Sequence, residues 1–386
     1  MTSKKSSRTQ AVQADIGTDS AYNAVSPPLY LSSTYNFNGF EDMGPYDYGR
    51  GGNPNREALG KAIAELENGA RGIVTASGMA AIDLVTNLLN NDELIVAPHD
   101  CYGGTHRLLT YRAKQGRAKV LFIDQNDKAA VKDALSQNPS LVMIETPSNP
   151  LMRLVDVAAI CKAARAVGAL SMVDNTFLSP ARQKPLDLGA DFVVHSTTKY
   201  LNGHSDVVGG CVVAKDAELG EQLAWWANCT GVTGAPFDSF LTLRGMRTLH
   251  ARMDIAEKSA GEIAKWLVKQ NTVAHVFYPG LKSDPGHKLM KSQQSGPGAM
   301  LSFQLTGGRD MAKTVLENTS IFQLAESLGG VESLICHPAT MTHRGMAVEA
   351  REIAGIKDNL IRLSVGLEDT ADLITDLKAS FAKALA

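Results

Sequence analysis

Several features that would point to a particular class of protein are missing from this sequence. The formal net charge is only -2 over 386 residues, so nothing favours nucleic acid or an anionic membrane as a partner. The five cysteines are scattered, and none forms a C-x-x-C pair. This usage favours free thiols in a reducing compartment over a disulfide framework, so we expect a cytoplasmic protein.

Long apolar runs and nucleotide or metal motifs are also missing. No apolar stretch approaches the roughly 20 residues that span a bilayer. The Ser- and Lys-rich start, Met1–Gln10, lacks the apolar run of a secretory signal. There is no G-x-G-x-x-G or Walker pattern, and the nine histidines never fall at metal-ligand spacing with cysteines. The sequence therefore predicts no membrane span, no nucleotide site and no metal.

The patterns that are present indicate an α/β fold of two or three domains. Short apolar runs, each followed by polar turn residues, alternate with helical patterns. We predict seven strands, at Gly72–Thr75, Glu93–Ala97, Lys119–Ile123, Leu141–Glu145, Leu170–Val173, Asp191–His195 and Gly209–Ala214. The predicted helices include Glu57–Glu67, Met79–Leu89, Lys128–Ser136 and Ala158–Val167. This alternation is typical of a mainly parallel sheet covered on both faces.

Both ends of the chain differ from this middle part. Up to about Pro54 there is little periodicity, and we expect this irregular segment to pack on other structure, either in the same chain or in another subunit. After about Met253 the pattern becomes α+β, with predicted helices at Ile255–Lys269 and Asp369–Ala384 and strands at Val273–Tyr278 and Ala299–Leu305. We therefore expect an N-terminal arm at residues 1–56, a large domain at 57–253 and a smaller domain at 254–386.

The strongest local motif is Ser196-Thr197-Thr198-Lys199-Tyr200, directly after a predicted strand. A lysine at the carboxyl edge of a sheet can form a Schiff base with an aldehyde. Hydroxyl residues before it can bind a phosphate. On frequency alone, however, a lysine after a strand end is more often an ordinary surface residue.

Two further features favour the chemical interpretation. Asp174 ends another apolar strand, where a carboxylate can keep a pyridine nitrogen protonated. Gly78 lies in a turn from a strand into a helix, whose first N–H groups can bind a phosphate. Each feature alone fits a turn or a helix cap. Together they supply a phosphate cradle, a partner for a ring nitrogen and a lysine for the aldehyde.

These residues resemble those of the Cys/Met-metabolism family of pyridoxal-phosphate enzymes. The resemblance runs from about Thr18 to Leu377. Its motifs are Tyr48-Gly49-Arg50 with Asn53-Pro54, Tyr102-Gly103-Gly104-Thr105, Pro147-Ser148-Asn149-Pro150, Ser196–Asp206 and Glu326-Ser327-Leu328-Gly329-Gly330. It implies an aspartate-aminotransferase-like α/β fold (fold type I), with a mainly parallel seven-stranded sheet and a smaller α+β C-terminal domain. It also implies pyridoxal 5'-phosphate as the cofactor, bound by the domain at 57–253.

The resemblance assigns a role to each site residue. Lys199 would hold the cofactor and shuttle protons, Asp174 would pair with the pyridine nitrogen, and Tyr102 would stack on the ring. The phosphate would be bound by Gly78, Met79, Ser196 and Thr198, together with Tyr48 and Arg50 of a neighbouring subunit. Arg362 would hold the substrate α-carboxylate, with Asn149 and Ser327 beside it. A homotetramer built from dimers with shared active sites follows from the same resemblance.

The reaction implied is γ-replacement. Glu326–Gly330 resembles the γ-acting members of the family. Ala224–Asn228 with Gly231–Gly234, and Met341–Met346, are similar to proteobacterial members that make L-cystathionine. In those enzymes cysteine displaces the acyl group of O-succinyl-L-homoserine or O-acetyl-L-homoserine, a transsulfuration step of methionine biosynthesis. A γ-lyase and an O-acetylhomoserine sulfhydrylase are the alternatives.

Three positions bear on the substrate. By resemblance, Glu326 would hold the amino group of cysteine and Arg107 a distal carboxylate. A surface cation at a helix start is an equal alternative for Arg107. Gly51 departs from the pattern, because some enterobacterial members carry a second arginine there. If that arginine binds the succinyl carboxylate, its absence makes O-acetylhomoserine a more plausible donor.

Overall fold

The structure is a computed structural model that describes residues 5–385. The first four residues of the Met1–Gln10 stretch, for which no secretory signal is predicted, lie outside the described residues. Within residues 5–385 no helix is both long enough and apolar enough to cross a bilayer.

All seven strands predicted for the large sheet are present, each to within one residue at either end. They are β1 Arg71–Thr75, β2 Leu94–Pro98, β3 Lys119–Ile123, β4 Leu141–Glu145, β5 Leu170–Asp174, β6 Phe192–Ser196 and β7 Gly210–Ala214, in the order β1-β7-β6-β5-β4-β2-β3. Strand β2 is parallel to β3 and β4, and β5 is parallel to β6. Strand β7 runs antiparallel to both of its neighbours, β1 and β6. The prediction of a mainly parallel seven-stranded sheet is therefore confirmed.

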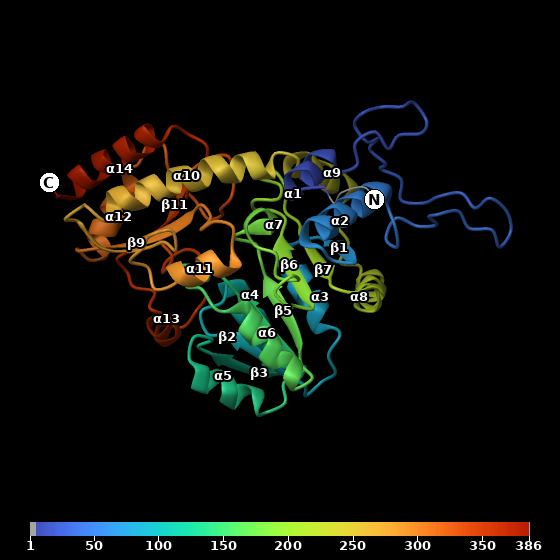
Figure 1. The fold of residues 1–386 in the computed structure, drawn as a ribbon, viewed down its shortest axis with the longest axis horizontal. Coiled ribbons are helices and arrows are strands. Elements are labelled where there is room, and N and C mark those ends of the chain that lie inside the picture. Colours follow the sequence, from blue (N-terminus) through green and yellow to red (C-terminus); the bar gives the residue numbers. More distant parts are fainter. Residues whose placement is uncertain (1–4, 386) are drawn as a thin grey trace. The chain divides into compact units, whose positions relative to one another are not determined.

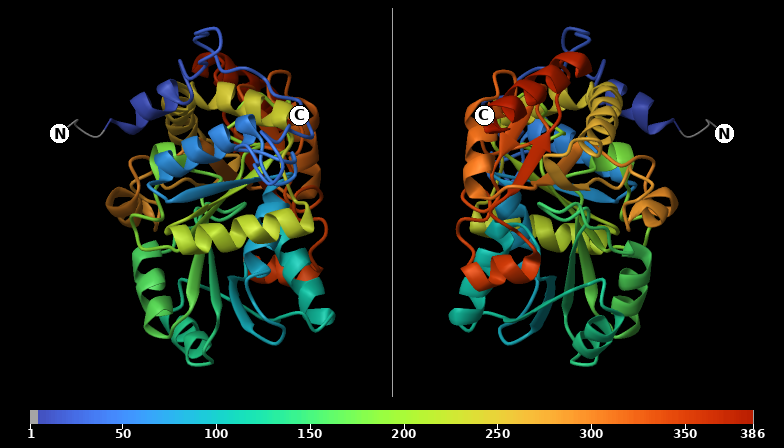
Figure 2. Two further views of the ribbon diagram at one scale, coloured as in Figure 1. Left: turned by 90° about the vertical axis from the view of Figure 1, so that its right-hand side faces the viewer. Right: turned by 90° about the vertical axis from the view of Figure 1, so that its left-hand side faces the viewer.

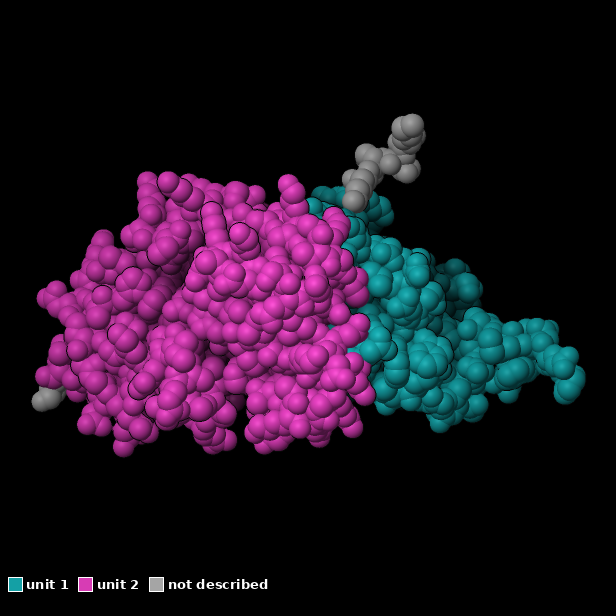
Figure 3. Space-filling view, turned by 90° about the horizontal axis from the view of Figure 1, so that it is seen from below, with its two compact units in different colours: residues 1–90, 172–250 teal, residues 91–171, 251–386 magenta. Residues whose placement is uncertain are grey.

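The chain divides into two compact units, each made of two sequence segments (Figure 3). The first unit comprises residues 1–90 and 172–250 and contains β1, β5, β6 and β7. Its helices are α1 Ser7–Gln13, α2 Pro54–Glu67, α3 Gly78–Thr86, α7 Ser179–Arg182, α8 Ala217–Thr230 and α9 Pro236–Met246. Helix α2 packs on β1, and α3 packs on β6 and β7 (Figure 1).

Helix α2 begins at Pro54 for a local reason. The Asn53 side chain accepts hydrogen bonds from the backbone N–H groups of Asn55 and Arg56, which have no partner inside the helix. Proline suits the first helical position because its missing N–H is not needed there. The helix ends at Asn68, whose left-handed φ of 61° closes the last turn.

The second unit comprises residues 91–171 and 251–386. It contains β2, β3 and β4 and a second sheet in the order β10-β11-β12-β9-β8. These strands are β8 Val273–Phe277, β9 Met300–Leu305, β10 Gln323–Leu324, β11 Leu334–Cys336 and β12 Leu360–Ser364. Its helices are α4 Gly103–Lys114, α5 Lys128–Leu135, α6 Val157–Ala166, α11 His287–Gln293, α12 Arg309–Glu317, α13 Val348–Ala354 and α14 Thr370–Leu385, with most of α10 Leu249–Leu267.

Aromatic and apolar contacts hold the elements of the second unit together. Helices α12 and α14 pack side by side, as Figures 1 and 2 show. The ring of Phe381 in α14 stacks on Trp266 of α10 at 5.7 Å and lies 5.9 Å from Phe303 of β9. Such aromatic pairs stabilise a core beyond the apolar area that they bury.

Some elements were not predicted from the sequence. The segment before Pro54 contains one short helix, α1, in which Ser6 caps the backbone N–H of Thr9. Strands β10, β11 and β12 were also missed. Two of them have three residues or fewer, and Arg362 interrupts the apolar run of β12. The domain bounds at residues 56 and 253 stay predictions.

Candidate active site

The segment around Lys199 is a compact turn after β6. The backbone N–H of Lys199 donates to Ser196 O at 3.2 Å, and its carbonyl accepts from Gly203 N at 2.8 Å. The Thr198 hydroxyl donates to Gly209 O at 3.2 Å and accepts from Gly209 N at 3.0 Å. These bonds fix the lysine-bearing turn against the start of β7.

Gly78 begins helix α3 and lies against the lysine segment. A Cβ at Gly78 would stand 2.8 Å from the Cβ of Ser196, so no larger residue fits without a shift. Ser77 caps the helix, and its hydroxyl accepts from Ala80 N at 3.1 Å. The predicted phosphate-binding residues Gly78 and Ser196 are therefore in contact, with a helix N-terminus beside them. This is a favourable place for an anion.

Asp174 is the last residue of β5, as the sequence predicted. Its carboxylate accepts from the backbone N–H of Thr176 at 3.0 Å. Burial raises the pKa of Asp174, whereas hydrogen bonds from Thr176 and the charge of His195 lower it. A cation placed beside Asp174 would favour its charged form.

Behind Asp174 lies a buried polar network that the sequence did not reveal. His195 Nε2 lies 2.7 Å from Oε1 of Glu67, and the two side chains are 1% and 0% exposed. The same Oε1 accepts from Asn175 Nδ2 at 2.9 Å, and Gln183 Nε2 donates to Asn175 Oδ1 at 3.2 Å. Glu67 lies in α2, more than a hundred residues before its partners, so no local pattern could have linked them.

In the second unit, Arg362 and Asn149 form a pair that suits a carboxylate. Arg362 lies in β12 and is 2% exposed. Its Nη1 donates to Asn149 Oδ1 at 2.8 Å, and its Nη2 donates to Ser327 O at 2.9 Å. Its buried Nε has no hydrogen-bond partner among the described residues. The three predicted carboxylate-binding residues are therefore brought together, and the guanidinium keeps donor capacity for a ligand.

Glu145, at the end of β4, connects this pair to Tyr102. Its Oε1 accepts from Asn149 N at 3.3 Å, and its Oε2 accepts from Tyr102 N at 2.8 Å. Tyr102 precedes α4, and 42% of its surface is exposed. Glu145 was not singled out from the sequence. Its place as the last residue of a buried strand, where parallel sheets carry functional groups, is the signal that could have found it.

Both residues predicted to select the substrate are exposed. Glu326 directly precedes Ser327, and Arg107 lies in the second turn of α4. A Cβ at Gly345 would stand 3.8 Å from Arg107 Nη1, so the residues around Gly345 lie beside this arginine.

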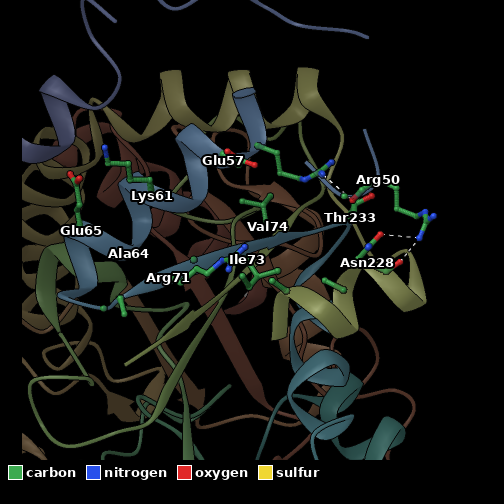
Figure 4. Close-up of a pocket in the computed structure, with 17 residues that line it drawn as sticks. Arg50, Glu57, Lys61, Ala64, Glu65, Arg71, Ile73, Val74, Asn228 and Thr233 are labelled. Atoms are coloured by element: carbon green, nitrogen blue, oxygen red, sulfur yellow. Dashed lines mark hydrogen bonds between the residues drawn. The ribbon is translucent and has the colours of Figure 1, made fainter. Parts of the chain in front are cut away.

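Tyr48 and Arg50, on the N-terminal arm, are exposed residues of the first unit. Figure 4 shows Arg50 beside Asn228. Arg50 Nη1 donates to the backbone and side-chain oxygens of Asn228 at 2.7 and 2.9 Å. Arg50 lines a pocket of about 450 Å³ together with Arg56, Lys61 and Arg71. The arm also exposes large apolar side chains, among them Tyr22, Val25, Leu31, Phe37 and Phe40.

Among residues 5–385 no cluster of three or more His, Cys, Asp or Glu side chains could hold a metal. The five cysteines are free thiols, four of them buried and Cys229 exposed.

Comparison with known proteins places these residues in a family. The chain is 55% identical over 374 residues to the cystathionine gamma-synthase of Escherichia coli K12, covering 97% of each chain. It is 44% identical to a cystathionine beta-lyase of Lactococcus lactis subsp. cremoris, covering 97% of this chain and 99% of the relative. The crystal structure of a cystathionine gamma synthase from Xanthomonas oryzae pv. oryzae, in complex with cystathionine, superposes with a TM-score of 0.98 at 54% identity and covers 99% of each chain. The profile of the family described as Cys/Met metabolism PLP-dependent enzyme matches residues 8–382, and the chain belongs to that family.

Proposed function

We propose that this enzyme is a cystathionine γ-synthase: cysteine sulfur replaces the acyl group of an O-acyl-L-homoserine, giving L-cystathionine and a carboxylate. The observation that carries the proposal is the similarity to γ-synthases along nearly the whole chain. Relatives named γ-lyases are less similar, at 43% identity. They supply the alternative, elimination from cystathionine.

The residues of the first unit fit pyridoxal phosphate. The contact between Gly78 and Ser196 leaves the start of α3 open to a phosphate, because neither the glycine nor the short serine covers the helix N-terminus. Burial raises the pKa of Asp174, and a protonated pyridine nitrogen is the kind of cation that would offset this cost. Lys199 lies on the same segment as Ser196, where its amine can bond the cofactor aldehyde.

In the mechanism that follows, the cofactor supplies an electron sink that stabilises negative charge on the substrate carbons. Asp174 keeps the ring nitrogen protonated through its carboxylate. The Nζ amine of Lys199 would hold the cofactor aldehyde and, when free, would move protons between the α and β carbons of the substrate. The Tyr102 side chain would lie against the ring and help to accept the proton of the substrate amine.

Arg362 orients the substrate. Its guanidinium binds the α-carboxylate, with Asn149 and Ser327 holding it from behind. Glu326 receives the amino group of the incoming cysteine, and Arg107 receives a distal carboxylate of the acyl group. Both are exposed, as suits residues that meet a substrate on entry.

The acyl donor depends on position 51. A Cβ at Gly51 would stand 3.5 Å from Tyr48 O, which is ordinary contact, and the residue has no left-handed φ. A side chain therefore fits there, and the backbone does not require glycine. We expect Gly51→Arg to raise kcat/KM for O-succinylhomoserine relative to O-acetylhomoserine. An unchanged ratio of kcat/KM for the two donors would show that position 51 takes no part in acyl recognition.

The arm supports an assembly with shared active sites. Tyr48, with 51% of its surface exposed, and Arg50 suit contact with the phosphate of a neighbouring subunit, and the exposed apolar side chains of the arm suit burial between copies. We propose that the enzyme is a homotetramer built from two dimers and that it works in the cytoplasm. Mixing inactive Lys199→Ala and Arg50→Ala variants after reversible dissociation should restore activity, because a mixed dimer has one site with both residues intact. No recovery in proven mixed dimers would contradict shared sites.

A paired assay tests the proposed reaction. The enzyme is incubated with an O-acylhomoserine plus cysteine, and separately with cystathionine alone. We expect cystathionine formation to be much faster than release of 2-oxobutyrate from cystathionine. The reverse order would replace the synthase with the γ-lyase.

A further inference from the structure

His343 lies beside the carboxylate-binding pair without being part of it. The ring is 1% exposed and belongs to the segment between β11 and α13. Its Nε2 lies 3.1 Å from Asn149 O, and its Nδ1 lies 2.8 Å from the Thr342 hydroxyl. Because a carbonyl oxygen only accepts, Nε2 carries the proton and donates it to Asn149. Nδ1 then accepts from Thr342, so a neutral ring satisfies both contacts.

Asn149 is held at three atoms as a result. Its N–H donates to Glu145, its backbone oxygen accepts from His343, and its side-chain oxygen accepts from Arg362. Asn149 is 2% exposed, so its carbonyl has little access to water and depends on the histidine for a donor. Loss of that donor would leave a buried acceptor unsatisfied and allow the residue to move.

The histidine itself is firmly placed. Its N–H donates to Pro338 O at 2.9 Å, and its carbonyl accepts from Met346 N at 3.0 Å. Met346 packs in an apolar cluster with Leu151, two residues beyond Asn149. Burial lowers the pKa of His343 to about 4, and the charge of Arg362 acts in the same direction. The ring is therefore neutral at pH 7, a state in which both of its hydrogen bonds can form.

We infer that His343 is a positioning residue, which holds Asn149, and through it the guanidinium of Arg362, in place for the substrate α-carboxylate. This inference rests on the proposed function, in which Arg362 binds that carboxylate. It assigns His343 an effect on carboxylate recognition alone. The amine of the substrate and the cofactor are bound by other residues.

The chain offers a matched control, His337. It is also buried, with 5% exposure, and its contacts follow the same pattern: Nδ1 lies 2.8 Å from the Thr340 hydroxyl and Nε2 lies 2.8 Å from Asp358 O. The carbonyl that it contacts belongs to a residue outside the carboxylate pair. His337→Leu therefore removes the same two hydrogen bonds without loosening Asn149.

The test compares two ligands that differ only in the carboxylate, L-homoserine and 3-amino-1-propanol. Their dissociation constants are measured on the cofactor-loaded enzyme from the change in its visible absorption, beside thermal unfolding of each variant. We expect His343→Leu to weaken L-homoserine about tenfold or more while 3-amino-1-propanol binds as before. His343→Gln, which keeps a side-chain N–H donor, should retain most of the preference. His337→Leu should lower the melting temperature but keep the ratio of the two constants.

The outcomes separate this inference from the proposed function. An unchanged ratio in folded His343→Leu, or an equal loss in His337→Leu, overturns the positioning role while the reaction stands. Equal binding of both ligands by the unmodified enzyme overturns the carboxylate role of Arg362 and the inference with it. If His343→Leu does not fold, Thr342→Val replaces it. That change removes the hydroxyl that fixes the ring, so the preference for L-homoserine over 3-amino-1-propanol should fall. An unchanged preference refutes the inference.

Discussion

Replacing Glu67 by glutamine tests the buried network behind Asp174. Glu67 Oε1 contacts both His195 Nε2 and Asn175 Nδ2, and Glu67 is fully buried. Its Oε2 has no hydrogen-bond partner among the described residues. In Glu67→Gln one carboxylate oxygen becomes an NH2 group, which takes either the position of Oε1 beside His195 or the position of Oε2. Even where the remaining oxygen still accepts from Asn175, it does not compensate for the buried NH2 donor that has been added.

The loss of stability in Glu67→Gln distinguishes an ion pair between Glu67 and His195 from a neutral hydrogen bond between them. Removing one partner of a buried ion pair costs about 3–5 kcal/mol, because the other charge is left uncompensated. Removing one partner of a neutral buried hydrogen bond costs about 1–3 kcal/mol. The charge of His195 is among the causes that lower the pKa of Asp174, so an ion pair would also support the cofactor site. We expect Glu67→Gln to lower the free energy of unfolding by about 3 kcal/mol or more and to weaken cofactor binding.

The assay is urea unfolding at fixed protein concentration and saturating cofactor, with cofactor release measured separately. Glu57→Gln is the matched control: the same change in the same helix, at an exposed carboxylate that accepts from the Tyr46 hydroxyl at 2.8 Å. Its cost should stay within about 0.5 kcal/mol. A double-mutant cycle with His195→Asn should give a coupling energy above about 1 kcal/mol. A cost below about 1 kcal/mol for Glu67→Gln, or additive losses in the cycle, would refute the reasoning.

Three further predictions follow from single side chains. Asp174→Asn should lower kcat about a hundredfold or more even when the cofactor is bound, because an amide cannot hold the ring nitrogen protonated; near-normal turnover would contradict its role. Arg362→Lys should raise KM for amino-acid substrates about tenfold or more, because an ammonium cannot replace both guanidinium hydrogen bonds. The control is Arg351→Lys, which changes a contact to Ala339 O and should leave KM unchanged. Although burial opposes it, hydrogen bonds from residues 320–322 lower the pKa of Asp376 below its usual 3.8. The unmodified protein should therefore be more stable than Asp376→Asn above that pH, and this difference should disappear as the pH falls further. The measurement is the urea midpoint of both proteins at pH 7, 5 and 3. The same difference between the two midpoints at all three pH values would contradict the prediction.

The large sheet could be predicted from the sequence because most of its strands are short apolar runs that are largely buried. Such runs differ plainly from the amphipathic helices between them, and β3 and β4 were predicted with their observed bounds. The residues at the strand ends could be predicted for the same reason. Asp174 and Ser196 are polar residues at the ends of strands with apolar runs, at the edge where such sheets carry ligands.

The supporting residues could not be predicted, because their partners are distant in sequence. His343 contacts a residue 194 positions earlier, and Glu67 contacts one 128 positions later. Neither side chain differs locally from an ordinary core or helix residue. Strand β12 was missed because Arg362 breaks its apolar run, and that arginine is also the residue proposed to bind the substrate carboxylate. Local patterns fail here because function requires a residue that the local structure does not favour.

The burial of the site residues explains where substrate selection can reside. Asn149 and Arg362 are each 2% exposed and hydrogen-bonded to each other, and Arg362 also donates to Ser327 O, so exchanging either would disturb the fold as well as the proposed carboxylate site. Glu326, Arg107 and Gly51 are exposed, and a larger residue fits at position 51. Substitutions at exposed positions of this kind usually change stability by no more than about 0.5 kcal/mol. Under the proposed function, the choice of acyl group and of the attacking thiol can therefore change at these three positions while the buried pair proposed to bind the carboxylate is kept. Variants at the three positions should alter substrate preference before they alter stability.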